Sequence, residues 1–257
     1  MSLAPSVTEI VCALGLGDRL VGVDKWSDFP PEVGALPKVG RIEADLDAIL
    51  ALHPDVVVAC TSVPGMERNV ERLAGSGLAL TVAEPTDLAG TLRSIRAIGD
   101  ALGRAAQADA LVTGMERRIQ RVAEAGRGGE PVSVYWEWWP KPLSAAAGRS
   151  WMNGVIEVAG GRNVFGAVDA SSLRPEPGDV AARDPEFVFV CWCGAKRPPD
   201  VAQIRARPGW EGVRAVVEDR VFAMPEGLFA RPGPRLVEGL ERLAAVLRDP
   251  SGATPDS

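Results

Sequence analysis

The chain has 257 residues, of which 46% are hydrophobic and 24% are charged, and its formal net charge is −6. This length exceeds one typical domain and fits two lobes of about 100–130 residues, each with its own core. The acidic balance argues against a nucleic-acid partner, because phosphate backbones attract basic surfaces. The longest apolar runs have the length of strands, far below the roughly 20 residues that cross a bilayer.

The N-terminus lacks the basic start and the apolar segment of a signal peptide. Residues 2–5 have the pattern of the end of a strand whose beginning is missing. One hypothesis is therefore that the true start lies upstream and that Met1 replaces an internal Val or Leu codon. A cytoplasmic protein is the alternative.

Predicted strands and helices alternate in residues 1–86, which predicts an α/β lobe with a mainly parallel sheet. Ser6 or Thr8 is expected to cap the first helix. Helices are expected at 6–16, 45–52 and 65–75, and strands at 19–24, 55–60 and 78–82.

Residues 87–128 form a predicted helical linker, because Leu88, Leu92 and Ile95 recur at helical spacing. Gly99 and Gly103 are expected to interrupt it. A second helix of about 20 residues then follows, about 30 Å long, which suffices to join two lobes.

The second lobe is expected at residues 129–248 and repeats features of the first. Residues 53–60 and 184–191 each place a Pro–acid pair before an apolar strand that ends in Cys. Two such lobes predict a cleft between them, with ligand beyond the carboxyl ends of the strands. Strands are expected at 132–136, 187–191 and 221–223, helices at 151–159, 200–206 and 233–247, and a disordered tail at 249–257.

The sequence contains no recognisable catalytic set. It lacks the phosphate-loop, nucleophile-elbow and zinc-protease motifs. The single histidine, His53, falls in a predicted helix-to-strand turn, and the four cysteines lack the spacing of a zinc site. We therefore expect neither an enzyme nor a bound metal.

Tryptophan is unusually frequent, with seven residues against one tyrosine. Three of them lie in residues 135–140, at the carboxyl end of a predicted strand, where Trp136 and Trp138 share one face. A core is expected to absorb one face of this segment but not both, whereas Trp26 and Trp192 fall in loops. Exposed indoles suit a broad, partly apolar ligand such as a corrin, a heme or a siderophore, and core packing is the alternative for each.

Short segments along nearly the whole chain resemble one family of transport proteins. In this order and spacing they resemble the class III periplasmic substrate-binding proteins of ABC importers, and in particular the vitamin B12-binding (BtuF-like) branch. The segments are residues 2–10, 13–15, 21–23, 26–31, 36–40, 47–58, 159–165 and 231–235.

The resemblance implies two Rossmann-like lobes with mainly parallel sheets, joined by one long α-helix around a ligand cleft. It implies a non-enzymatic monomer, periplasmic or at the cell surface, that carries cobalamin or a related corrinoid to an ABC permease and ATPase. Hydroxyl groups among its contact positions suit the amide side chains of a corrin. The implied ligand-binding residues are Pro5, Ser6, Trp26, Asp28, Thr61, Ser62, Trp136, Trp138, Trp192, Phe229 and Arg231.

The family docks on its permease through an exposed acidic residue on each lobe. Glu67 or Glu71 matches the first position, and Asp200 is the candidate for the second. The stretch before Asp200 departs from the pattern because Lys196 and Arg197 make it basic.

Three alternatives stay open. A ferric siderophore would require several cations, for which Arg231, Lys25 and Lys141 are candidates. A heme would require a Tyr or His ligand, which leaves Tyr135 and His53. The third alternative is a cytoplasmic corrinoid-handling protein or enzyme on the same fold. For a corrinoid, the resemblance predicts that Trp136→Ala weakens binding.

Overall fold

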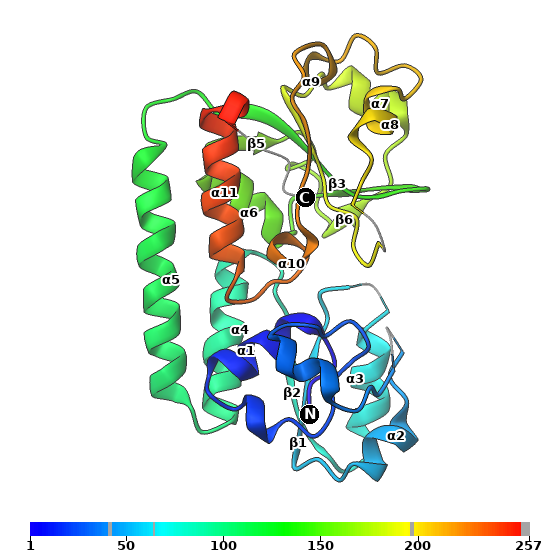
Figure 1. Ribbon diagram of the computed structural model, residues 1–257, viewed down its shortest axis with the longest axis vertical. Helices are drawn as coiled ribbons and strands as arrows, with labels where there is room; N and C mark the ends of the chain where they lie inside the picture. The colour runs from blue at the N-terminus through cyan, green and yellow to red at the C-terminus, as the bar shows by residue number, and fades with distance from the viewer. Residues whose placement is uncertain (41–42, 64, 196–197, 253–257) are drawn as a thin grey trace. The chain divides into compact units, whose positions relative to one another are not determined.

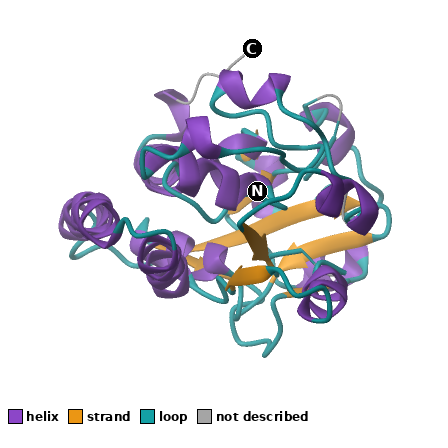
Figure 2. Cartoon of the chain, turned by 90° about the horizontal axis from the view of Figure 1, so that it is seen from below, coloured by secondary structure: helices purple, strands orange, loops and turns teal. Residues whose placement is uncertain are grey.

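The computed structural model describes residues 1–40, 43–63, 65–195 and 198–252. The chain divides into two compact units, and helices occupy much more of it than strands (Figure 2). Unit 1 comprises Met1–Glu116 and Arg231–Pro234, and unit 2 comprises Arg117–Ala230 and Arg235–Ser257. Both units combine helices with parallel strands, which confirms the predicted α/β class.

Unit 1 is built on two parallel strands, β1 (Val56–Cys60) and β2 (Ala79–Ala83). Val57 and Ala59 of β1 pack with Ile49 and Leu73 on one face. Since alternate residues of a strand point to opposite faces, Cys60 faces the other side, where the first and fourth helices lie (Figure 1). The helices are α1 (Pro5–Ala13), α2 (Leu46–Ala51), α3 (Glu67–Ala74) and α4 (Leu88–Ala101), with 3₁₀ turns η1 (Gly17–Arg19) and η2 (Pro31–Ala35).

Two local expectations for unit 1 are wrong. The strand expected at 19–24 is reduced to an isolated bridge between Val23 and Lys38. Pro37, next to this bridge, has no N–H with which to extend a ladder. The expected cap by Ser6 or Thr8 is also wrong, because the N-cap is Ala4 and makes no side-chain cap. Pro5 occupies the first helical position, where a missing N–H costs nothing.

The helix break predicted in the linker is confirmed at one of its two glycines. Gly103 has φ +66°, a left-handed conformation that suits glycine, and it separates α4 from the 21-residue helix α5 (Ala105–Ala125). Gly99 instead lies inside α4. A Cβ atom at Gly99 would come within 2.3 Å of the Cβ of Ala108, so glycine serves close helix packing there.

We expect Gly99→Ala to lower the free energy of unfolding by about 1–3 kcal/mol, because the new methyl group overpacks the contact with Ala108. The matched control is Gly114→Ala in α5, where an added Cβ meets no atom within 4 Å. That change should raise stability by about 0.5–1 kcal/mol through helix propensity. Urea unfolding measures both, and equal effects from the two variants would contradict the packing argument.

Unit 2 is built on a six-stranded sheet in the order β6-β4-β3-β7-β8, with β5 paired to β3. The strand β3 runs parallel to β5 and β7 and antiparallel to β4. It therefore lies inside the sheet, with partners on both edges. The strands are β3 (Val132–Pro140), β4 (Leu143–Ala146), β5 (Gly161–Asn163), β6 (Ser172–Leu173), β7 (Phe187–Val190) and β8 (Val221–Ala223).

Helices cover both faces of this sheet. Tyr135 packs in a cluster with residues of α7 (Pro177–Ala182), α8 (Val201–Arg205) and α9 (Arg214–Val217). On the other face, Trp136 lies against the ring of Phe229, at the end of α10 (Glu226–Phe229), and Trp138 lies against Trp151, at the start of α6 (Trp151–Val158). The expectation that a core absorbs only one face of this strand is therefore wrong.

The C-terminal helix α11 (Leu236–Arg248) continues into the 3₁₀ turn η3 (Pro250–Gly252). The side chain of Asp249 accepts hydrogen bonds from the backbone N and the hydroxyl of Ser251, at 3.1 and 2.6 Å. The disordered tail expected at 249–257 is thus wrong for residues 249–252, and residues 253–257 lie outside the described part. None of the helices that the structure describes is long and apolar enough to cross a membrane.

Candidate functional site

Several sequence-predicted residues of unit 1 gather at one edge of its extended segments. The N–H of Leu3 donates to Val58 of β1, and the N–H of Ser2 donates to Gly22. Three extended segments thus run side by side and end at the same edge. The residues that follow these ends are Pro5 and Ser6, then Trp26 and Asp28, then Thr61 and Ser62.

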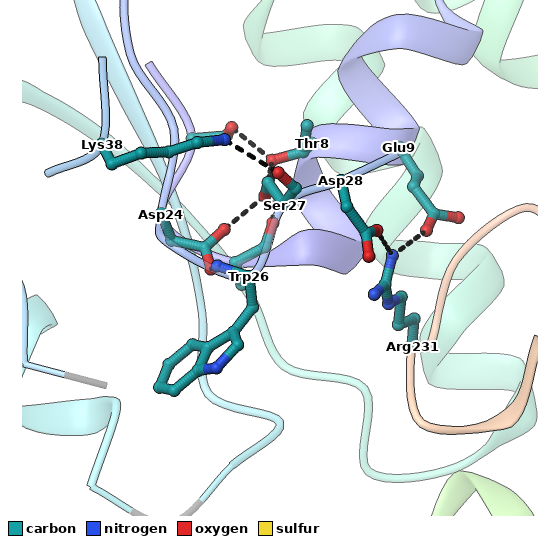
Figure 3. Close-up of polar contacts among 10 residues, drawn as sticks. Thr8, Glu9, Asp24, Trp26, Ser27, Asp28, Lys38 and Arg231 are labelled. Atoms are coloured by element: carbon teal, nitrogen blue, oxygen red, sulfur yellow. Dashed lines mark hydrogen bonds and ion pairs between the residues drawn. The ribbon is translucent and has the colours of Figure 1, made fainter. Parts of the chain in front are cut away.

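A chain of buried hydroxyl groups ties the loop that follows Gly22 to α1. The hydroxyl of Thr8 lies 2.6 Å from the hydroxyls of both Ser2 and Ser27. Ser27 in turn donates to the carboxylate of Asp24, and the ammonium of Lys38 donates to the Ser27 carbonyl at 2.9 Å (Figure 3). Burial raises the pKa of Asp24. The network fixes the backbone on both sides of Trp26.

Trp26 is held by its backbone rather than by its ring. Its N–H donates to Asp24 at 2.8 Å, and its indole is partly exposed. Figure 3 shows the indole directed away from the hydroxyl network. The ring is therefore positioned and accessible, as a ligand contact requires.

Arg231 forms a charged cluster with two acids of the same unit. Its Nη1 donates to Glu9 at 3.1 Å and to Asp28 at 2.6 Å (Figure 3). Arg231 and Glu9 are buried, whereas the side chain of Asp28 is 71% exposed. Since two carboxylates share this guanidinium, it is a weak receptor for a further anion.

The end of β1 carries small polar groups. Ser6 is buried, and burial raises the pKa of the Cys60 thiol. Thr61 and Ser62 are partly exposed, and the Thr61 hydroxyl lies 3.4 Å from the Ala83 carbonyl. The hydroxyl oxygens of Thr61 and Ser62 can thus accept hydrogen bonds from a ligand, while Ser6 is covered.

Two indoles of unit 2 are accessible at the ends of neighbouring strands. Trp139, at the end of β3, is 40% exposed, and Trp192, just after β7, is partly exposed. Their ring centroids lie 6.4 Å apart. They present apolar area where two neighbouring strands end.

The other predicted aromatic contacts of unit 2 belong to its core. Trp136 has centroids of Trp138 and Phe229 at 5.7 and 5.0 Å, and all three side chains are buried. The indole N–H of Trp151 donates to the Phe229 carbonyl at 2.9 Å, which holds that end of the core. A contact role for Trp136, Trp138 or Phe229 does not agree with this burial.

Sequence reasoning missed a buried ion pair in unit 2. Glu137, between the aromatic residues of β3, is fully buried and pairs with Arg207. The sequence did contain a signal for it, which is an acidic residue within a strand of aromatic residues. Because buried charges are almost always paired, such a residue predicts a basic partner. Its partner is 70 residues away and has no mark in the sequence.

Neither predicted heme ligand is well placed. Tyr135 is fully buried and donates to Glu137, and burial raises its pKa far above the usual range, so a phenolate is disfavoured. His53 is exposed with φ 45° in the turn before β1, at the end of the strand opposite to Thr61 and Ser62. Within the described ranges, no group of three or more His, Cys, Asp or Glu side chains is placed to hold a metal ion.

The three acids predicted for docking are all exposed. Glu67 and Glu71 lie on α3, and Glu67 accepts from the N–H of Gly65 at 2.8 Å. Asp200 caps α8 by accepting from the N–H of Ala202 at 3.0 Å. Lys196 and Arg197 lie outside the described residues.

Comparisons with known proteins agree on one family. A family model described as periplasmic binding protein matches residues 1–228. An uncharacterized ABC transporter substrate-binding lipoprotein, YvrC of Bacillus subtilis, is 32% identical over 95% of this chain and 78% of its own length. A vitamin B12-binding protein of Pectobacterium carotovorum is 26% identical over 96% of this chain and 87% of its own. The solved periplasmic heme-binding protein RhuT from Roseiflexus sp. RS-1 has a TM-score of 0.82 at 27% identity, covering 96% of this chain and 97% of its own.

Proposed function

The chain belongs to the periplasmic binding protein family, and from this premise we propose that it binds cobalamin or a related corrinoid and delivers it to an ABC importer. The family confirms the resemblance predicted from the sequence and the two-lobed α/β fold. Periplasmic binding proteins are transport components rather than enzymes. We propose that the protein acts as a monomer.

The observation that carries the choice of a neutral ligand is the cluster around Arg231. Its guanidinium donates to Glu9 and Asp28, so the best cation for an anionic siderophore already has two carboxylate partners. Cobalamin instead offers amide groups and a broad apolar ring, which match hydroxyl and indole side chains. The vitamin B12-binding relative supports the same ligand class.

Heme is the second candidate, because the heme-binding structure is also similar to this chain. Two observations weigh against it. Tyr135 is buried with its hydroxyl on Glu137, and His53 lies before β1 rather than after it. A heme would therefore lack the tyrosine or histidine ligand that commonly holds its iron in such sites.

The proposed contact residues follow from exposure. In unit 1 they are the predicted ligand-binding residues whose side chains are partly or fully exposed. Ser6 and Arg231 are buried and are proposed to stabilise the site without contacting the ligand. In unit 2 they are Trp192 and, in addition to the sequence prediction, Trp139. The unit 1 contacts are Pro5, Trp26, Asp28, Thr61 and Ser62.

Calorimetric titration with cyanocobalamin tests this function, with heme and a ferric siderophore as parallel ligands. We expect one-to-one binding at micromolar affinity or tighter, about −8 kcal/mol or more favourable. Trp26→Ala should weaken binding, whereas Val217→Ala, at an exposed residue of α9, should leave it nearly unchanged. If heme alone binds, the ligand is heme rather than cobalamin. If none of the three ligands binds, the result favours the cytoplasmic alternative.

Docking on the permease is a further part of the proposal. Glu67, Glu71 and Asp200 are exposed carboxylates that could pair with basic residues of a transporter. We expect Glu67→Lys/Glu71→Lys to keep cyanocobalamin affinity but to lose most stimulation of the transporter ATPase in proteoliposomes. Asp18→Lys, on the exposed turn η1, is the matched control. Unchanged stimulation by the double variant would exclude the α3 acids.

We also propose that the protein works outside the cytoplasmic membrane, as its family does. The cytoplasmic corrinoid-handling protein stays the competing hypothesis. Fractionation of the native host with an antibody to this chain decides between them, and a signal confined to the cytosol would contradict export.

A further inference from the structure

Glu137 is the most deeply buried charged group among the described residues of unit 2, and the proposed function gives it no role. It lies on β3 between Trp136 and Trp138, and it has no exposed surface. A buried carboxylate is costly unless charged or polar donors surround it. The groups that donate hydrogen bonds to Glu137 therefore indicate its role.

Three side chains donate to this carboxylate, and two of them, Arg207 and Trp192, come from distant parts of the chain. Arg207 binds it with both terminal nitrogens, at 2.5 Å to Oε2 and 2.7 Å to Oε1. Tyr135 donates to Oε2 at 3.2 Å, and the indole N–H of Trp192 donates to Oε1 at 3.0 Å. The fork of Arg207 fixes the plane of the carboxylate, and this plane sets the direction in which Trp192 must point.

Two of the donors to Glu137, Arg207 and Tyr135, are held in place by the core. The guanidinium of Arg207 lies 4.8 Å from the ring centroid of the buried Trp210. Tyr135 packs edge-on against Trp210 and Phe165, with centroids 5.8 and 6.1 Å apart. Neither donor can move without disturbing the core, so Glu137 has one orientation.

Trp192, by contrast, belongs to neither a helix nor a strand and is partly exposed. The backbone N–H of Cys191 donates to the Glu137 carbonyl at 2.9 Å, which holds only the start of its loop. The indole packs against the core cluster that contains Tyr135, and its single N–H has the charged acceptor Glu137, which selects the orientation of the ring. That orientation sets the ring 6.4 Å from the exposed ring of Trp139.

We propose that Glu137, fixed by Arg207, is a positioning residue that holds the Trp192 indole in its ligand-binding orientation. The ligand-contact part of this inference rests on the proposed function, whereas the hold on Trp192 does not. A buried ion pair alone adds little to stability compared with apolar residues of the same size. The hydrogen bond from the partly exposed Trp192 indole gives the Glu137–Arg207 pair a role outside the core.

The hydrogen bond between the Trp192 indole and Glu137 is tested by NMR of the indole N–H groups, without any ligand. Trp192→Phe assigns the Trp192 resonance by its disappearance. In Glu137→Gln we expect the exchange protection of this N–H to fall roughly tenfold or more, as loss of a charged acceptor implies. The matched control is Tyr135→Phe, which removes the donor on the other carboxylate oxygen and should leave the protection within about twofold. Unchanged protection in Glu137→Gln, or an equal loss in Tyr135→Phe, would overturn the proposal.

The ligand part is tested by a double-mutant cycle on cyanocobalamin affinity. Glu137→Gln and Trp192→Phe should each weaken binding by roughly five- to tenfold, and the double variant should be no weaker than either alone. Additive losses would show that Glu137 acts other than through Trp192. If Glu137→Gln does not fold, a Trp192→Phe protein of unchanged affinity would by itself overturn the ligand role. If the unmodified chain binds no corrinoid, the proposed function fails while the exchange experiment still decides the hold on Trp192.

Discussion

Trp136→Ala is expected to lower the free energy of unfolding by about 3–5 kcal/mol, because it empties a fully buried aromatic site. The ring of Trp136 lies among those of Trp138, Phe189 and Phe229, at centroid distances of 5.0–5.8 Å. Urea unfolding monitored by circular dichroism measures the change. Weaker ligand binding by this variant would then report loss of the unit 2 core rather than loss of a ligand contact.

The neighbouring residue Trp139 supplies the control, because 40% of its surface is exposed. Trp139→Ala should cost about 1 kcal/mol or less in stability. A second comparison uses the indole nitrogen of Trp136, which is buried and has no hydrogen-bond partner among the described residues. Trp136→Phe removes this unsatisfied N–H, so it should cost clearly less than Trp136→Ala. A Trp136→Ala protein as stable as the original would contradict the burial of this strand on both faces.

Arg231→Met is the second change with a large expected effect. It removes the cation shared by Glu9 and Asp28 while keeping most of the apolar side-chain volume. Since Glu9 is buried, the loss of its ion-pair partner should lower the free energy of unfolding by about 3–5 kcal/mol at neutral pH. Thermal and urea unfolding both measure this loss.

A cycle with Glu9→Gln separates the charge from the packing. The double variant Glu9→Gln/Arg231→Met should recover a substantial part of the loss, because it removes the buried carboxylate together with its cation. The exposed pair of Arg96 with Asp109 is the control, and Arg96→Met should cost about 0–1 kcal/mol. Equal effects at Arg231 and Arg96 would contradict the buried cluster.

Much of the order of elements was predictable because it rests on local patterns, whereas short elements such as β4, β6 and α7 were not predicted. Apolar runs bounded by Pro and Gly marked β1, β7 and β8, and helical spacing marked α4 and α5. Gly103 broke the linker helix as expected, since a positive φ suits glycine. Gly99 was misjudged as a break because the same residue type also serves close packing, and only the neighbour Ala108 distinguishes the two uses.

The candidate site was predictable in part. Loop residues such as Trp26 and Trp192 were identified because position after a strand is visible in the sequence. The burial of Trp136 and Phe229 was not visible, because it depends on helices that cover the second face of the sheet. The pairs Glu137–Arg207 and Glu9–Arg231 join residues 70 and 222 positions apart, and no local pattern encodes such contacts.

Hydrogen–deuterium exchange with and without cyanocobalamin tests the central proposal, which is that a corrinoid contacts the residues that follow the strand ends. We expect added protection in peptides that contain Trp26, Thr61 and Trp192. Peptides from η1 and from the turn at His53, which lie away from these ends, should exchange at unchanged rates. Protection confined to other segments, or no protection at saturating cyanocobalamin, would contradict the proposed binding site.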